Sequence, residues 1–306
     1  MIAQALRLLR VERNVRDLDR AQSFYCGALG FTAVSENREA RPAWSQLPGV
    51  CAAPPRSVRL RLRAQQIELT AFDAPGAPYP ADSSSADLWF QHCAIVVDDM
   101  EAAYARLLRH GGVTAISRDG PQTLPPSSGG VIAYKFRDPD GHPLELMAFP
   151  QDVGDPVWHH MNSDGAMLGI DHSAISVASA DRSITFYAGL LGFTLTTRQT
   201  NRGPEQDLLD ALSDVAVDVI ALQPEEARTP HIELLGYRTP RGRAPSSIAV
   251  CDIAADRLVL KVRGLPALLE TTADANVIAT GAVDSADGSQ AAVLRDPDGH
   301  LLVLIV

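Results

Sequence analysis

The chain has few of the features that mark secreted, membrane or nucleic-acid-binding proteins. It has four cysteines in 306 residues, far apart and without a Cys-x-x-Cys pair, which favours a reduced, cytoplasmic protein over a disulfide scaffold. No run of about 18 apolar residues is present, and the charged opening segment is unlike a signal peptide. Because the net charge is −10, we expect neither nucleic acid nor an anionic membrane as partner.

What the chain contains instead is a hexapeptide that occurs twice. RDPDGH stands at 137–142 and again at 295–300, each time between two short apolar runs. Pro fixes φ, Asp bonds its own backbone and Gly accepts a positive φ, so this string is typical of a β-hairpin turn. Two other pairs of segments match at similar offsets: 17–31 with 179–193, and 65–72 with 230–237. The chain is therefore an internal duplication.

The repeats divide the chain into two halves. We expect a first domain over 1–150, a linker rich in Pro, Gly and Asp over 151–168, and a second domain over 169–306. Each half contains two smaller units of the form strand, helix and several strands, so the chain reads as four βαβββ modules. The predicted helices lie at about 19–29, 99–110, 181–191 and 266–272. Asp17 or Asp19 is expected to cap the first of them.

Three motifs resemble those of a known group. They are FY…LGF after the first helix, IEL at the end of one module, and DPDGHxLEL at the end of the next. They are similar to motifs of the vicinal oxygen chelate superfamily, which includes glyoxalase I, bleomycin- and fosfomycin-resistance proteins and type I extradiol dioxygenases. The resemblance covers nearly the whole chain. It implies an α+β fold in which the modules pair into two open, curved mixed β-sheet barrels with helices outside.

The resemblance also implies where a divalent metal would bind. Each module of such a barrel contributes a first-strand ligand, usually His, and a last-strand ligand, usually Glu. The eight corresponding positions are Arg10, Glu68, His92, Glu145, His172, Glu233, Arg257 and Val303. Arginine does not lose its proton and valine has no donor atom, so Arg10, Arg257 and Val303 cannot bind a metal.

Strand alternation supports the remaining positions. His92 and His172 each share a strand face with small residues, which indicates space beside the imidazole. Glu145 and Glu233 each lie between apolar neighbours, where a buried carboxylate needs a partner such as a metal or an arginine.

Two ways of pairing the modules stay open. If neighbouring modules pair, as in the extradiol dioxygenases, each barrel holds one of the two histidines. If module two pairs with three, as in monomeric tandem glyoxalases, one barrel collects all four intact ligands. They are His92, Glu145, His172 and Glu233. The other barrel then contains all three losses, and Arg10 can neutralise Glu68. We favour this second arrangement because it leaves one complete site.

A site with two imidazoles and two carboxylates suits one divalent ion, namely Zn²⁺, Ni²⁺, Mn²⁺, Co²⁺ or Fe²⁺. A substrate with two adjacent oxygens would complete the coordination. The resemblance then implies an enzyme, a glyoxalase-like isomerase or lyase that works through an enediolate, with Glu145 or Glu233 transferring the proton.

Two alternative functions stay open. An Fe(II) extradiol ring-cleaving dioxygenase fits the two-domain length. Its relatives keep their metal in the C-terminal half, however, and here Arg257 and Val303 have replaced two ligands of that half. The other alternative is a metal-free small-molecule binding or resistance protein.

Several further residues are candidates for contact with the substrate. Tyr237 follows the strand of Glu233 and can donate a hydrogen bond to a substrate oxygen. Glu205 and Gln206, in an expected loop, are placed to line the cavity of the third module. The repeated hairpin histidines, His142 and His300, are expected to be structural. The expected partner is a small-molecule substrate, and a homodimer is left open.

Overall fold

The computed structural model describes residues 4–38, 55–160, 167–245, 248–274, 279–280, 282–284 and 290–306. Cys51 and residues 161–166 of the expected linker lie outside the described residues. The other three cysteines are free thiols. Within the ranges described, no helix combines the length and apolar character needed to cross a membrane.

The first half of the chain forms two modules. The first consists of β1 (Gln4–Asn14), α1 (Leu18–Gly27), β2 (Thr32–Arg38), β3 (Arg56–Leu62) and β4 (Gln65–Ala71). The second consists of β5 (Gln91–Val97), α2 (Met100–His110), β6 (Thr114–Ala115), β7 (Gln122–Thr123), a 3-10 turn (Pro126–Ser128), β8 (Ile132–Arg137) and β9 (Pro143–Ala148). Both helices begin at a side-chain cap, because Asp17 accepts a hydrogen bond from the Arg20 N–H and Asp99 accepts one from the Ala102 N–H.

The second half follows a 3-10 turn in the linker (Pro156–His159). Its first module consists of β10 (Met167–Ser176), α3 (Ala180–Ile184), a π-helical segment (Thr185–Leu190), β11 (Thr194–Arg202), α4 (Pro204–Asp210), β12 (Ala216–Gln223) and β13 (His231–Thr239). Its second consists of β14 (Arg257–Arg263), α5 (Leu265–Asp274), β15 (Val283–Asp284), β16 (Gln290–Arg295) and β17 (Leu301–Ile305). The expectation of a loop around Gln206 was wrong, because Pro204, in the first turn of a helix, begins α4.

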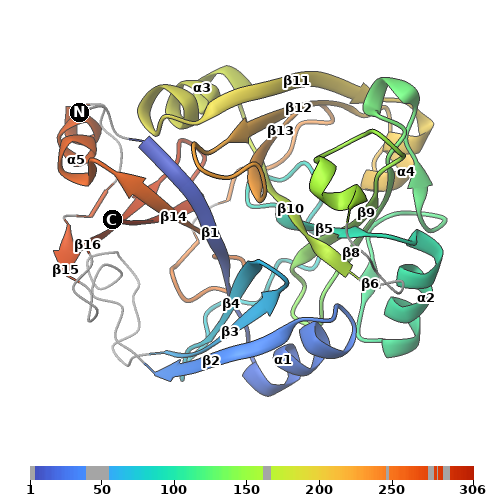
Figure 1. Cartoon of the computed structure of the whole chain (residues 1–306), viewed down its shortest axis with the longest axis horizontal. Helices are drawn as coiled ribbons and strands as arrows, with labels where there is room; N and C mark the ends of the chain where they lie inside the picture. Colours follow the sequence, from blue (N-terminus) through green and yellow to red (C-terminus); the bar gives the residue numbers. More distant parts are fainter. Residues whose placement is uncertain are drawn as a thin grey trace.

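The strands form two open mixed sheets, and each sheet takes one module from each half of the chain (Figure 1). The first has the order β15-β16-β17-β14-β1-β4-β3-β2, and the second has the order β11-β12-β13-β10-β5-β9-β8-β6, with β7 beside β8. An antiparallel pair joins the modules in each sheet, β1 with β14 and β10 with β5. The predicted α+β architecture is confirmed, and so is the pairing of module two with three and of one with four.

The strand register confirms how the modules correspond. Across β10 and β5, His172 pairs with the residue two positions after His92. Across β1 and β14, Arg10 pairs with the residue two positions after Arg257. The last-strand residues Glu145, Val303, Glu233 and Glu68 each pair with the residue two positions after the first-strand position of their own module. Glu145 in the second sheet is therefore equivalent to Val303 in the first, and Glu233 is equivalent to Glu68. The two sheets therefore present equivalent sets of four positions.

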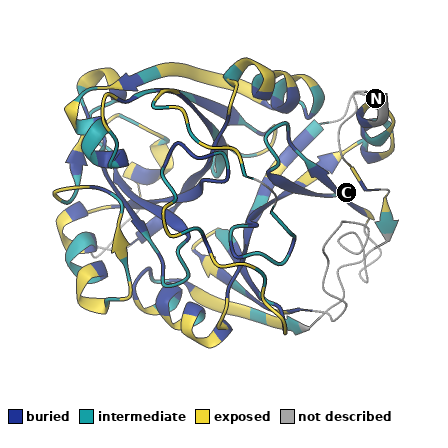
Figure 2. Ribbon diagram, turned by 180° about the vertical axis from the view of Figure 1, so that it is seen from behind, coloured by how far each residue is buried: buried dark blue, intermediate teal, exposed yellow. Residues whose placement is uncertain are grey.

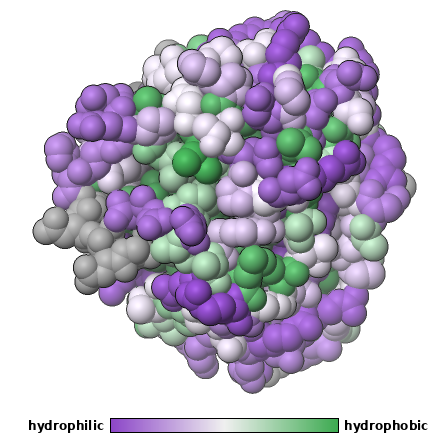
Figure 3. All heavy atoms as spheres, turned by 90° about the vertical axis from the view of Figure 1, so that its right-hand side faces the viewer, coloured by the Kyte–Doolittle hydropathy of each residue, from purple (hydrophilic) through white to green (hydrophobic). Residues whose placement is uncertain are grey.

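Helices cover the outer faces of the sheets, and the strands between them are largely buried (Figure 2). The repeated FY pairs are core residues, since Phe24, Tyr25, Phe186 and Tyr187 are all buried. Burial of each such side chain stabilises the fold by about 1.5–3 kcal/mol. On the face viewed in Figure 3, hydrophobic side chains gather toward the middle and hydrophilic ones surround them. The fold thus has an ordinary apolar core, and its polar buried residues need separate explanations.

The repeated hairpin has the same role in both halves. Gly141 has a φ of +100° and Gly299 has a φ of +99°. Only glycine adopts this backbone conformation readily. His142 Nε2 lies 3.0 Å from the Ile253 carbonyl oxygen, and His300 Nε2 lies 3.0 Å from that of Ser176. His142 therefore ties its hairpin to a segment of the other half of the chain, and His300 ties its hairpin to β10 of the preceding module, as expected of structural residues.

Candidate metal centre

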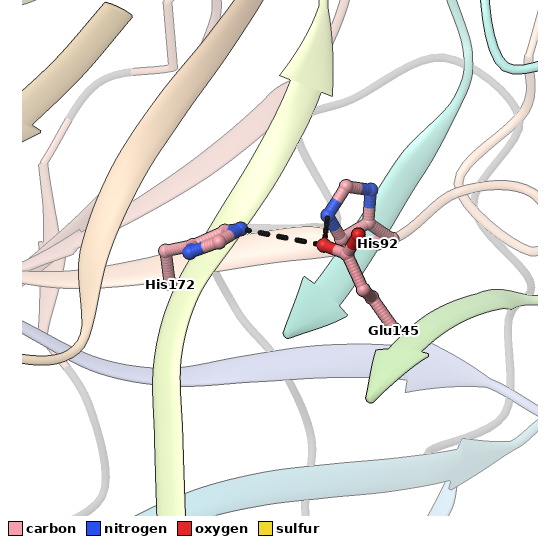
Figure 4. Close-up of side chains that lie close together, drawn as sticks. All are labelled: His92, Glu145 and His172. Atoms are coloured by element: carbon pink, nitrogen blue, oxygen red, sulfur yellow. Dashed lines mark ion pairs between the residues drawn. The ribbon is translucent and has the colours of Figure 1, made fainter. Parts of the chain in front are cut away.

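Three side chains converge from the three central strands of the second sheet (Figure 4). They are His92 on β5, Glu145 on β9 and His172 on β10. Glu145 Oε2 lies 3.0 Å from His92 Nε2 and 3.9 Å from His172 Nε2. One ligand atom of each lies within 4.8 Å of the others. This spacing allows a single metal ion to bind between the three.

The fourth predicted ligand lies on the other side of His172. Glu233, on β13, has its Oε2 atom 3.4 Å from His172 Nε2. Its side chain is 19% exposed, whereas that of Glu145 is 7% exposed. The structure therefore brings all four predicted positions to one place, with Glu233 at the more open side.

The buried nitrogen atoms of this cluster fit a metal. Nδ1 and Nε2 of His92 and Nε2 of His172 are buried and form no hydrogen bond of good geometry with the described residues, although His92 Nε2 lies 3.0 Å from Glu145 Oε2. Buried polar atoms almost always have a partner, so these three need an explanation. A metal ion supplies the missing partner for Nε2 of both histidines. The imidazole and carboxylate donors suit the divalent transition ions.

The charges around the cluster favour ionised carboxylates. Burial alone would raise the pKa of Glu145, but His92 and Lys135 outweigh it and lower the pKa to about 2. Burial is likewise outweighed at Glu233, where His172 and His231 lower the pKa to about 2. Both carboxylates are therefore ready to bind a cation at neutral pH.

The two histidines differ in their protonation. Burial lowers the pKa of His92, which favours the neutral imidazole that a metal binds. Burial also acts to lower the pKa of His172, but Glu233 and Asp171 outweigh it and raise that pKa to about 9. Without a metal ion, the surrounding carboxylates thus hold His172, unlike His92, as a cation, and a metal that binds Nε2 displaces its proton.

Sequence reasoning missed the residues that support His172. Asp171 Oδ2 lies 3.0 Å from His172 Nδ1, and the indole of Trp158 donates a 2.8 Å hydrogen bond to Asp171 Oδ1. A carboxylate on the far nitrogen of a metal-binding histidine fixes the ring orientation and leaves Nε2 for the metal. His231, also missed, has its Nε2 atom 3.5 Å from Glu233 Oε1.

A β-bulge explains why Asp171 was missed. Simple alternation places consecutive residues on opposite faces of a strand. In β10, Ile170 pairs with Ile95 and His172 pairs with Ala94, so Asp171 is an extra residue without a partner in the pairing. A bulge re-aims the side chains around it. Nothing in the local sequence marked this bulge.

The cluster opens into a cavity of about 450 Å³ between β8, β9, β11, β12 and β13. The two residues predicted to bind substrate, Gln206 and Tyr237, both line it. Their donors are directed to Asp210, however: Gln206 Nε2 lies 2.7 Å and Tyr237 Oη 2.9 Å from Asp210 Oδ2. Tyr237 therefore lines the cavity while its hydroxyl donates a hydrogen bond to a carboxylate.

The equivalent place in the first sheet is filled by arginine. Arg10 Nε lies 2.8 Å from Glu68 Oε2, and Arg10 Nη2 lies 2.6 Å from Glu12 Oε1. Arg257 donates a 2.9 Å hydrogen bond to Asn14 Oδ1. The expected neutralisation of Glu68 by Arg10 is confirmed, and an ion pair stands where the other sheet has its histidine cluster.

Comparison with known proteins gives the same family twice along the chain. The sequence model of the Glyoxalase/Bleomycin resistance protein/Dioxygenase superfamily matches residues 7–146 and 169–304. The chain therefore belongs to this superfamily. A search among curated proteins finds no match.

Solved structures with the same fold span nearly the whole chain. Glyoxalase I from Zea mays is 19% identical with a TM-score of 0.63, and the match covers 98% of this chain and 92% of that one. A putative dioxygenase from Bacillus subtilis subsp. subtilis str. 168 is 14% identical with a TM-score of 0.62, over 99% of this chain and 85% of that one. At such identity the likeness shows a shared fold.

Proposed function

We propose that this superfamily member is a divalent-metal-dependent enzyme, a glyoxalase-like isomerase or lyase that acts on a small substrate with two adjacent oxygens. The observation that carries the proposal is the convergence of His92, Glu145, His172 and Glu233 on one cavity, with buried imidazole nitrogens that form no hydrogen bond of good geometry in the described chain. Zn²⁺, Ni²⁺, Mn²⁺, Co²⁺ and Fe²⁺ all suit this donor set.

The proposed roles of the four residues follow from their surroundings. His92, Glu145 and His172 would hold the ion, and Asp171 would fix the ring of His172 through its Nδ1 atom. The bound ion would polarise the two adjacent oxygens of the substrate as a Lewis acid.

Glu233 is the better candidate for the proton-transferring base. Glu145 is more deeply buried, and His92 Nε2 lies only 3.0 Å away, so its carboxylate has little freedom. Glu233 is more exposed and lines the cavity from β13, which lies on the other side of β10 from β5 and β9. Its carboxylate would take a proton from the substrate carbon beside the carbonyl and return it to the neighbouring carbon.

Two measurements test the proposal. Protein purified without chelators should contain about one equivalent of a divalent metal per chain. Glu145→Gln should bind the metal much more weakly, whereas Glu233→Gln should keep it and lose the exchange of substrate protons with deuterated water. NMR on a set of 2-hydroxycarbonyl compounds measures this exchange. Glu68→Gln, at the equivalent position in the first sheet, is the matched control and should keep both properties.

The opposite results have clear meanings. A chain that takes up no metal even after reloading would favour the metal-free binding protein. Deuterium exchange that survives in Glu233→Gln would remove this residue from the base role.

One observation favours a second candidate, an Fe(II) extradiol dioxygenase. His92, Glu145 and His172 form a tight set of two histidines and one carboxylate without Glu233. That set is the ligand triad of non-haem iron oxygenases. Oxygen uptake with Fe(II) and catechols, with ring-cleaved products, would support this candidate and overturn the isomerase.

A further inference from the structure

A second polar group lies beside the metal ligands and is not explained by them. Lys135, on β8, pairs directly with Glu145 on β9. Side chains at such paired positions share a face, with their Cβ atoms about 5 Å apart. Lys135 is 4% exposed, lines the cavity, and has its Nζ atom 2.6 Å from Asp210 Oδ1. A buried ammonium therefore stands next to the proposed metal centre.

The fold itself does not demand a lysine here. Module four carries the same hairpin, and its residue at this position is Val293, which pairs with Val303 as Lys135 pairs with Glu145. An apolar side chain thus satisfies the same place in the strand. At this position of the hairpin, the sheet with the full ligand set has a buried lysine and the other sheet has a valine.

Asp210 organises the donors around it. It accepts hydrogen bonds from Lys135, Gln206 and Tyr237, and all three of these residues line the cavity. The carboxylate of Asp210 is fully buried behind them. Asp210 therefore holds three cavity-lining side chains in place. A ligand in the cavity would contact those side chains and not Asp210 itself.

Two groups of this network, the Lys135 ammonium and Gln206 Oε1, still have unused hydrogen-bonding capacity. An ammonium has three N–H donors, and within the described chain Lys135 gives one hydrogen bond, to Asp210. Gln206 Oε1 has no partner although the residue is only 4% exposed. Because a carboxylate only accepts, the Gln206 amide nitrogen must face Asp210, and Oε1 is turned away from it.

We propose that Lys135 and Gln206 form a subsite for one uncharged substrate group that both accepts and donates a hydrogen bond, in the simplest case a hydroxyl. The group accepts from Lys135 Nζ and donates to Gln206 Oε1. The substrate class is then a compound with two adjacent oxygens and a further hydroxyl. The inference rests on the proposed function, in that the adjacent oxygens bind at the metal centre.

Charge and hydrogen bonding exclude the other simple groups. A carboxylate would face Gln206 Oε1 without a donor and would add a negative charge beside Glu145 and Asp210. An apolar group would leave the other Nζ donors of Lys135 and the Oε1 atom of Gln206 unpaired in a buried wall. Sites built to pair with a hydroxyl discriminate strongly against analogues that lack it, for this reason.

Calorimetry on the full chain loaded with Zn²⁺, under anaerobic conditions, tests the subsite with catechols. Pyrogallol and 3-(hydroxymethyl)catechol carry a third hydroxyl at two distances from the adjacent oxygens. 3-Methylcatechol and 3-ethylcatechol have the same shapes without it, and 2,3-dihydroxybenzoate carries a charge instead. At least one hydroxylated ligand should bind about tenfold or more tightly than its apolar match.

Variants assign the preference to the two residues. Gln206→Leu should bring the ratio of affinities close to one, and so should the charge-balanced pair Lys135→Met with Asp210→Asn. Gln206→Leu should leave the affinity for Zn²⁺ unchanged. Arg59→Met is the matched control, because Arg59 pairs with Glu68 in the first sheet as Lys135 pairs with Glu145. It should keep the full preference.

The outcomes separate this inference from the proposed function. A protein that binds neither Zn²⁺ nor catechol overturns both. Binding of catechols without a preference for the third hydroxyl, or with the same preference in Gln206→Leu, overturns the subsite alone. Tightest binding of 2,3-dihydroxybenzoate would identify an anion site at Lys135 and would also overturn the hydroxyl assignment.

Discussion

The two copies of RDPDGH hold their first aspartate in opposite electrostatic surroundings. Burial acts to raise the pKa of both carboxyls. At Asp138 this is outweighed by His142, whose Nδ1 lies 2.9 Å from Oδ2, and by Arg13, so the pKa falls to about 2. At Asp296 burial prevails over His300, and the pKa is raised. The ionised form of this aspartate therefore stabilises the folded chain at position 138 and destabilises it at position 296.

Asp138→Asn should destabilise the protein at neutral pH. A pKa lowered from 3.8 to about 2 corresponds to about 2.4 kcal/mol of folding free energy. The folded pKa lies below the unfolded one, so this contribution is fully present above about pH 4 and is lost as the pH falls toward 2. Between pH 5 and 2, His142, whose pKa is raised above 6.5, is protonated in both folded and unfolded chains. The change in the free energy of unfolding over this pH range therefore reports on Asp138 and not on His142.

Urea unfolding of the parent, Asp138→Asn and Asp296→Asn at pH 7, 4 and 2.5 measures the effect. Both aspartates accept the same backbone hydrogen bonds within their hairpins. Any loss from those bonds therefore cancels between the two variants. Asp296→Asn should be as stable as the parent at pH 7 or more so, because the charge it removes opposes folding. Equal losses in the two variants, or a loss in Asp138→Asn that is the same at pH 2.5 as at pH 7, would refute the reasoning.

Two further predictions concern the two sets of equivalent positions. Trp158→Phe removes the indole donor to Asp171 and should weaken metal binding about tenfold or more, measured by competition with a chelator; unchanged affinity would show that this contact does not support the site. Arg10→Met should cost about 3 kcal/mol in urea unfolding, because it leaves the buried Glu68 without its closest cation. The metal content should not change in this variant, and a fall would show that the two sheets are coupled.

Local chemistry predicted much of the fold. The Pro-Asp-Gly turn and the aspartate cap of α1 depend on contacts within a few residues, and each is found as expected. The helix at α4 was missed because its start, Pro204, stands in a segment that reads equally well as a loop. The third helix begins as expected near Asp181 but widens into a π-helical segment from Thr185 onward.

Within the site, the alternation of side chains along each strand predicted the metal-ligand candidates. It missed Asp171, which lies at a β-bulge, and the contact between Lys135 and Asp210, which are far apart in sequence. His92, Glu145, His172 and Glu233 lie in regular alternation, so their shared face was readable. Asp171 depends on a bulge that appears only when β10 pairs with β5. Lys135 and Asp210 meet across 75 residues of sequence, and no local pattern connects them.

The sequence by itself determined that the chain is a duplication, and the family resemblance implied eight corresponding positions, three of which cannot bind a metal. Only the tertiary structure decided which modules share a sheet. The choice depends on whether the first strands of modules two and three pair with each other, and that pairing joins residues about 80 positions apart in sequence. The first strands of all four modules offer a backbone edge and apolar side chains, so hydrogen bonding alone does not distinguish the partners. In the fold β10 pairs with β5, and this pairing of distant segments brings two separate histidines into one site.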